Sequence, residues 1–159
     1  MLKARIFVPL LLAALAAAAW GLSLLPVRVL EFANTDKGRV SRLLVSADSS
    51  FSVTYQHSIY GQPVTEEFVL APDDAIVLAA VQSPSGAVLA YFGFAGGEER
   101  QPVERRLGEV VFRIAAGEPQ RITLGSRELS FLEFGEHGDR LAMAVSRVPL
   151  GRALLGAFN

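Results

Sequence analysis

Polar and apolar residues alternate with a period of two along most of the chain from Val27 onward. In one such segment Phe51, Val53 and Tyr55 alternate with small polar residues. This period is typical of a strand with one buried face and one face in water. Between the segments lie short stretches rich in Gly, Pro, Asn, Asp and Ser, which favour turns. We therefore predict strands at 27–33, 40–46, 51–58, 64–70, 75–81, 87–94, 109–115, 120–124, 128–134 and 140–147.

Strands at this spacing, with no amphipathic helical window between them, predict an all-β fold. We expect an antiparallel β-sandwich or a small barrel, preceded by one N-terminal apolar helix. Residues 75–81 and 87–94 are apolar on both faces, so we expect these strands to be central in the sheet or to be covered by a partner. The mixed-charge stretch 98–106 is expected to be a solvated loop.

The first 26 residues differ in kind from the rest. Residues 6–25 form an apolar run that comes after Lys3 and Arg5. A helix of about 20 apolar residues spans roughly 30 Å, the thickness of the hydrocarbon core of a bilayer. Basic residues on the N-terminal flank alone predict a cytoplasmic N-terminus and export of the remaining chain. We expect residues 1–26 to be a membrane anchor or a signal segment.

Three interpretations of this segment remain open. A cleavable signal peptide could end near the small residues 17–19. The apolar run continues beyond them through Trp20 and Leu25, which favours an uncleaved anchor in the membrane. A buried N-terminal helix of a soluble protein is the third. The first two interpretations give an extracytoplasmic β domain over 27–148, held at the inner (cytoplasmic) membrane, and an apolar tail over 149–159. The tail could form an edge strand, a short helix or a hook for a partner.

Composition excludes several classes of function. The chain contains no cysteine, so it has no disulfide, no thiolate metal site and no lipid-modified cysteine. Without the first 26 residues, which carry only Lys3 and Arg5, the 15 basic and 16 acidic residues become 13 and 16, a net charge of −3. No basic patch with interleaved aromatic residues is present, so a nucleic-acid partner is not expected.

Residues 51–68 give the most specific signal. Read as a hairpin closed by Gly61 and Gln62, they place His57 opposite Glu66, and Tyr55 beside them on the same apolar face. Directly opposed side chains lie about 5 Å apart at Cβ, within reach of a hydrogen bond. Pro63 has no N–H to close such a tight turn, so a wider loop remains open, and a slip of two residues would break the pairing.

The predicted pair has either a structural or a functional role. It could fix the strand register, or it could form a polar site for a partner or a small ligand. Catalysis would need an activated nucleophile, but Ser58 points to the other face of the strand, and no nucleophile elbow, zinc motif or phosphate loop occurs. We expect no catalytic residue, no metal site and no cofactor. The candidate binding residues are Tyr55, His57, Ser58, Pro63 and Glu66.

The motif Tyr55-x-His57-Ser58-Ile59, with Pro63-Val64-x-Glu66 after it, resembles the signature of a bacterial family of uncharacterised small exported domains. Members of that family are associated with TAXI-type TRAP transporters, which take up organic acids and related solutes. The resemblance implies one N-terminal membrane segment, an all-β domain, and membrane or solute-binding subunits of the transporter as partners. Two features depart from the family pattern. Residues 60–62 carry no charge, and the glycine-rich segment after the hairpin is matched only approximately by 83–86 and 92–97.

The sequence thus predicts a membrane-anchored accessory protein of a TAXI-type TRAP uptake system, and not an enzyme. A small-molecule binding module for organic acids is the alternative. A periplasmic hydrolase is the second alternative, and it lacks an evident nucleophile.

Overall fold

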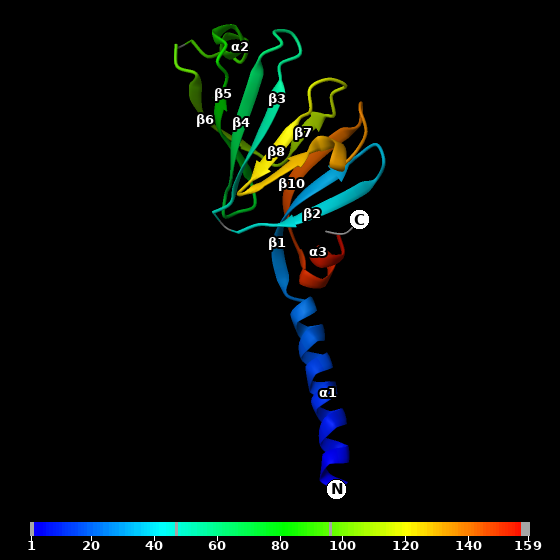
Figure 1. Ribbon diagram of the computed structural model, residues 1–159. Helices are drawn as coiled ribbons and strands as arrows, with labels where there is room; N and C mark the ends of the chain where they lie inside the picture. Colours follow the sequence, from blue (N-terminus) through cyan, green and yellow to red (C-terminus); the bar gives the residue numbers. More distant parts are fainter. Residues whose placement is uncertain (1, 47, 96, 157–159) are drawn as a thin grey trace.

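The computed structural model describes residues 2–46, 48–95 and 97–156 (Figure 1). These residues are mostly β and form two antiparallel sheets, so the small-barrel alternative, which needs one closed sheet, is wrong. The four-stranded sheet has the order β2-β1-β10-β7. Its strands are β1 (Pro26–Asn34), β2 (Arg39–Leu44), β7 (Val110–Arg113) and β10 (Arg140–Pro149).

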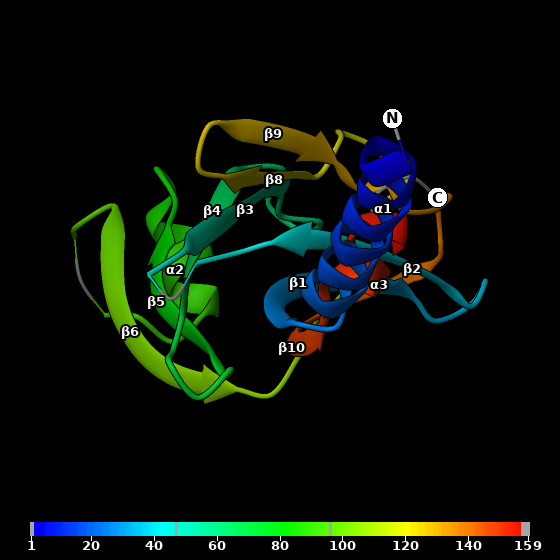
Figure 2. The same cartoon turned by 90° about the horizontal axis from the view of Figure 1, so that it is seen from below.

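The six-stranded sheet has the order β6-β5-β4-β3-β8-β9. Its strands are β3 (Ser50–Gln56), β4 (Pro63–Leu70), β5 (Ile76–Gln82), β6 (Arg100–Leu107), β8 (Arg121–Leu124) and β9 (Arg127–Ser130). Seen from below, this sheet curves around β1 and β10 (Figure 2). One core joins the two sheets, because Leu30 and Phe32 of β1 belong to the same buried cluster as Phe68 of β4.

The prediction of a strand over 87–94 is wrong, because most of this segment belongs to the helix α2 (Gly86–Tyr91). Ser85 caps this helix, since its side chain accepts a hydrogen bond from the backbone N–H of Val88. Gly93 lies just after the helix with φ +87°, a conformation that glycine adopts at little cost beyond a helix end. The apolar residues that suggested a buried strand are the helix residues Val88 and Leu89, which are buried in the core.

Two other expectations differ from the structure. Most of the predicted loop 98–106 is the strand β6, at an edge of the six-stranded sheet. Val103 and Leu107 of β6 pack against the core, while its charged residues are exposed. A charged edge strand opposes unwanted pairing with another sheet, so these charges suit that position. The predicted strand 128–134 ends early, at β9, and a short 3-10 helix, η1 (Phe131–Glu133), comes next.

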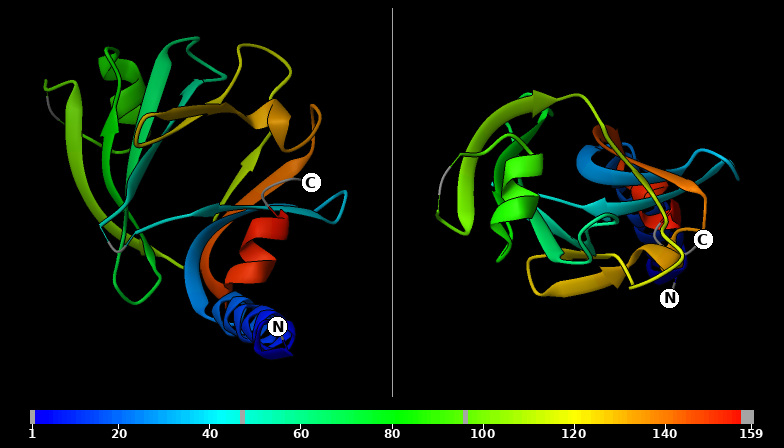
Figure 3. Two further views of the ribbon diagram at one scale, coloured as in Figure 1. Left: turned by 60° about the horizontal axis from the view of Figure 1, so that its bottom comes forward. Right: turned by 90° about the horizontal axis from the view of Figure 1, so that it is seen from above.

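Two further helices lie at one end of the β domain. The N-terminal helix α1 (Leu2–Ser23) projects away from both sheets, and α3 (Leu150–Gly156) lies against the domain end of α1 (Figures 1 and 3). In the part of the chain that the structure describes, no helix combines the length and the apolar character needed to cross a membrane. Residues 157–159 of the predicted apolar tail, and Met1 of the N-terminal segment, lie outside the described residues.

Arg28, two residues into β1, connects the two sheets near the end of α1. Its Nε donates to Asp74 Oδ1 at 2.9 Å, and its Nη groups donate to the backbone oxygens of Ser46 and Ala71. Asp74 lies in the turn between β4 and β5 and also accepts from Arg147 of β10 at 2.8 Å. The hydrogen bond from Arg147 and the charges of both arginines lower the pKa of Asp74. The side chain of Arg28 is only 10% exposed, whereas that of Arg147 is 59% exposed.

This difference in burial predicts unequal effects of two matched substitutions. Arg28→Met should lower the free energy of unfolding by about 3 kcal/mol, because it removes a buried charge partner of Asp74 and leaves backbone oxygens unpaired. Arg147→Met removes an exposed partner of the same carboxylate and should change stability far less. Denaturant unfolding of the full chain, monitored by circular dichroism, measures both. Equal losses in the two variants would contradict the role assigned to burial.

Candidate functional site

The β3–β4 hairpin differs in register from the sequence prediction. Tyr55 pairs with Val64 and Val53 with Glu66, so the expected opposition of His57 and Glu66 is wrong. The cause is a wider loop. His57 N–H donates to Gln62 O at 2.8 Å, and Gly61 N–H donates back to His57 O at 2.8 Å. The strands therefore end at Gln56 and Pro63, and His57 belongs to the loop rather than to the sheet.

Glu66 has Tyr55 as its partner instead. The Tyr55 hydroxyl donates to Glu66 Oε1 at 2.6 Å, on the core-facing side of the six-stranded sheet. The Tyr55 ring packs edge-on against Phe112 of the other sheet, at 6.0 Å between centroids. Burial raises the pKa of the Glu66 carboxyl, although the hydrogen bond from Tyr55 acts in the opposite direction. Burial and the nearby carboxylate raise the pKa of Tyr55 as well.

His57 is buried, with 6% of its surface exposed, and its contacts are aromatic. Its ring lies 4.7 Å from Tyr91 and 5.9 Å from Phe92, both nearly perpendicular to it, and 5.2 Å from Tyr60. The backbone N–H of Ile59 donates to His57 Nδ1 at 3.2 Å, so this nitrogen acts as a hydrogen-bond acceptor. His57 thus packs the hairpin loop against α2.

The remaining two candidate residues are exposed. Ser58 lies in the loop, and Pro63 begins β4. The backbone oxygen of Pro63 accepts a hydrogen bond from the Ser83 hydroxyl at 2.8 Å, which ties the hairpin to the segment before α2. The structure therefore separates the five candidates into a Tyr55–Glu66 pair inside the domain and a His57 loop at its tip.

The His57 loop and α2 present four exposed apolar or aromatic side chains, which we call the aromatic patch: Ile59, Tyr60, Tyr91 and Phe92. Ile59 and Tyr91 are the most exposed, at 66% and 59%. The β3–β4 loop and α2, which carry the patch, lie at the end of the domain opposite α1 (Figure 1). The predicted strand over 87–94 did not reveal that Tyr91 and Phe92 belong to this patch. The Ser85 cap and the glycine at position 93 were the signals that could have revealed it.

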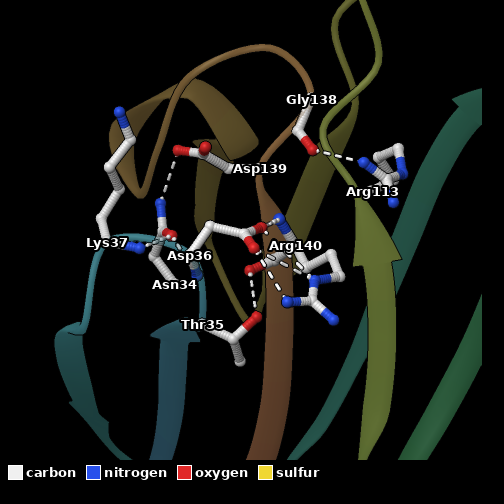
Figure 4. Close-up of polar contacts among 8 residues, drawn as sticks. All are labelled: Asn34, Thr35, Asp36, Lys37, Arg113, Gly138, Asp139 and Arg140. Atoms are coloured by element: carbon white, nitrogen blue, oxygen red, sulfur yellow. Dashed lines mark hydrogen bonds and ion pairs between the residues drawn. The ribbon is translucent and has the colours of Figure 1, made fainter.

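A second group of residues that the sequence did not reveal lies at one end of the four-stranded sheet (Figure 4). The buried Asn34 donates to Asp139 Oδ2 at 2.8 Å, and its own oxygen accepts from Lys37 N at 2.9 Å. Asp36 accepts three hydrogen bonds from the Arg140 guanidinium and one from the Arg140 backbone N–H. The backbone N–H of Glu136 and the amide of Asn34 lower the pKa of Asp139. Because these polar groups already form hydrogen bonds with one another, we assign them a structural role. They join the β1–β2 turn to the loop between η1 and β10.

The arrangement offers limited chemistry. Among the described residues, no group of three or more His, Asp or Glu side chains could hold a metal ion. A shallow hollow of about 210 Å³ beside Tyr55 and Pro63 is lined by neither His57 nor Glu66. Tyr55, His57 and Glu66 therefore do not form the single polar site that the predicted register implied.

Comparison with protein-family models, with curated proteins and with solved structures finds no match to this chain.

The Tyr55–Glu66 pair predicts a pH-dependent effect of Glu66→Gln. The pKa of Glu66 is higher in the folded state than in the unfolded state. The neutral carboxyl group therefore contributes fully to stability at a pH below the unfolded pKa, about 4.3. This contribution is lost as the pH rises through the folded pKa. The amide introduced by the substitution stays neutral at every pH, and its oxygen can still accept from Tyr55. The variant should therefore gain stability relative to the wild type as the pH rises from about 4 to about 8.

Thermal unfolding of both proteins across this pH range measures the difference, and subtraction removes the contribution of all other groups. Tyr55→Phe is the companion variant. It takes the donor from a half-buried carboxylate and should lower the free energy of unfolding by about 1–3 kcal/mol at neutral pH. A constant difference between Glu66→Gln and the wild type at every pH would contradict burial of an ionisable group.

Gly135 provides a test of the Asn34–Asp139 group. A Cβ at this position would lie 2.4 Å from Asn34 Nδ2 and 2.9 Å from Ile114 Cδ1. Gly135→Ala should lower the free energy of unfolding by about 1–3 kcal/mol, because the buried amide must move. Gly117→Ala is the control, since nothing lies within 4 Å of its Cβ position. Chemical unfolding that shows equal stability for both variants would exclude the tight packing described.

Proposed function

We propose that this chain is a membrane-attached accessory protein that binds a protein partner through the aromatic patch. The observation that carries the proposal is the patch itself. Tyr and other aromatic side chains dominate the energetic centres of protein interfaces, and exposed apolar clusters commonly mark such sites. His57 supports the patch from beneath through ring contacts with Tyr60, Tyr91 and Phe92. It therefore acts as a positioning residue rather than as a direct contact.

Attachment to the inner membrane through residues 6–25 is part of the proposal. Its support is the apolar sequence of this segment together with its exposure. The described side chains of α1 from Pro9 to Leu22 are all exposed, Trp20 by 71%. An apolar helix that the β domain leaves uncovered needs another apolar environment. In this proposal the β domain, a β-sandwich, lies on the extracytoplasmic side and presents the aromatic patch away from the bilayer.

The proposed partner is a membrane or solute-binding subunit of a TAXI-type TRAP transporter. The support is the resemblance of the hairpin motif, whose His57 and Ile59 lie beneath and within the aromatic patch. A small-molecule module built on Tyr55, His57 and Glu66 is the weaker candidate, because the hollow beside Tyr55 includes neither of the other two side chains.

The proposal predicts that the full chain co-purifies in detergent with tagged subunits of such a transporter. Tyr91→Ser should weaken this association by about 2 kcal/mol, roughly 30-fold, since it removes an aromatic contact at the centre of the interface. Ile59→Ser, which removes an exposed side chain of the patch, should weaken it as well. Leu132→Ser changes an exposed leucine of η1 outside the patch and should have no effect.

Circular dichroism of each variant separates loss of binding from loss of folding. Failure of the wild-type chain to associate with any transporter subunit would count against the partner. Unchanged association of a folded Tyr91→Ser variant would exclude the patch as the contact surface.

A further inference from the structure

An open hollow of about 680 Å³ lies at the end of the domain that carries α1. Its wall is formed by the end of β2, the connection to β3, the turn between β8 and β9, and α3. Polar and charged groups share this wall with Leu44, Ala153 and Leu154. The volume lies in the range of hollows that bind small ligands. The aromatic patch and the Tyr55–Glu66 pair contribute no residue to this wall.

The hollow carries charges of both signs that are free to bind a ligand. Across residues 2–46, 48–95 and 97–156, the side chains of Arg127 and Asp48 form no ion pair or hydrogen bond, and both are exposed. Arg42 uses Nη2 to hold Glu31 at 3.0 Å, and its buried Nε has no hydrogen-bond partner in the same residues. The hydroxyl of Ser126 lies beside Arg127 in sequence, at the tip of the β8–β9 turn.

The hollow that carries these charges lies beside α3, the helix that contacts the end of α1. Residues Ala153 and Leu154 of α3 line the hollow, and the first turn of α3 lies against the end of α1. A Cβ at Gly151 would lie 3.3 Å from Ser23 Cβ, and Leu150 N–H donates to Leu25 O at 2.8 Å. If α1 lies in a membrane, the hollow is within reach of the head groups. Leu154 and Leu155 expose apolar surface at the same end, by 48% and 75%.

We infer that this hollow binds the head group of a phospholipid that carries both a phosphate and a primary ammonium group. The phosphate is placed against Arg127 and Ser126, because a guanidinium matches the geometry of phosphate oxygens. The ammonium is placed against Asp48. The first carbons of the acyl chains meet Leu44 and Leu154. This inference rests on the membrane attachment that is part of the proposed function.

The test is native mass spectrometry of the full chain, purified in detergent and titrated with phosphatidylethanolamine. The wild type should retain one lipid molecule. Arg127→Gln and Asp48→Asn should each reduce lipid retention at least fivefold. Arg105→Gln is the matched control, because Arg105 is an exposed arginine of β6 that also lacks a side-chain partner among the described residues. It should retain lipid as the wild type does.

Head-group variants define the chemistry. Phosphatidylcholine, which has no N–H to donate to Asp48, and phosphatidylglycerol, which has no cation, should each be retained less than phosphatidylethanolamine. Equal retention of all three lipids, or unchanged retention by both folded variants, would overturn the inference. Inorganic phosphate or free ethanolamine phosphate should not displace the lipid at equal concentration. Displacement by either would assign the hollow to a soluble anion and also overturn it.

A flotation assay with vesicles separates this inference from the proposed attachment. Wild type and Arg127→Gln should both float with the vesicles, since α1 is unchanged. If both float while lipid retention does not depend on Arg127 or Asp48, only the head-group site fails. If the wild type does not float, the attachment itself fails, and the head-group inference fails with it.

Discussion

The buried guanidinium of Arg28 connects the four-stranded sheet to two connections of the six-stranded sheet, next to α1. It lies at the start of β1, directly after α1, and reaches the β2–β3 connection and the β4–β5 turn. Few side chains could satisfy a carboxylate and two backbone oxygens at once, and arginine can because its planar group carries five donors. The direction in which α1 leaves the domain is therefore linked to the packing of the sheets.

The period-two pattern was sufficient to predict the β-rich fold, because a strand such as β3 buries Phe51 and Val53 while the residues beside them are more exposed. The pattern gave a wrong prediction where the position of a segment in the fold, rather than its polarity, decides the structure. Residues 87–94 are apolar on both faces, which suits a covered strand or a short buried helix equally well, and only the capping residues distinguish the two. The β6 segment is charged because it is an edge strand, and the sequence alone could not identify it as an edge.

The candidate site was predictable as a region but not as a geometry. Tyr55, His57 and Glu66 do lie on one hairpin, yet a loop wider by a few residues gives each a different neighbour. The missing N–H of Pro63 was a local sign of this wider loop. The contacts of His57 with Tyr91 and Phe92 depend on tertiary packing of α2, and the Asn34–Asp139 bond joins residues 105 positions apart. No local pattern indicates contacts of this range.

The pairing of β1 with β10 brings the two ends of the β domain next to each other. Pro26 pairs with Pro149, so the chain enters and leaves the β domain at one point. A folded unit whose ends are adjacent can be inserted into a loop of a larger protein without stretching either connection. The same fold could thus exist as a separate chain or as an insert in a host protein.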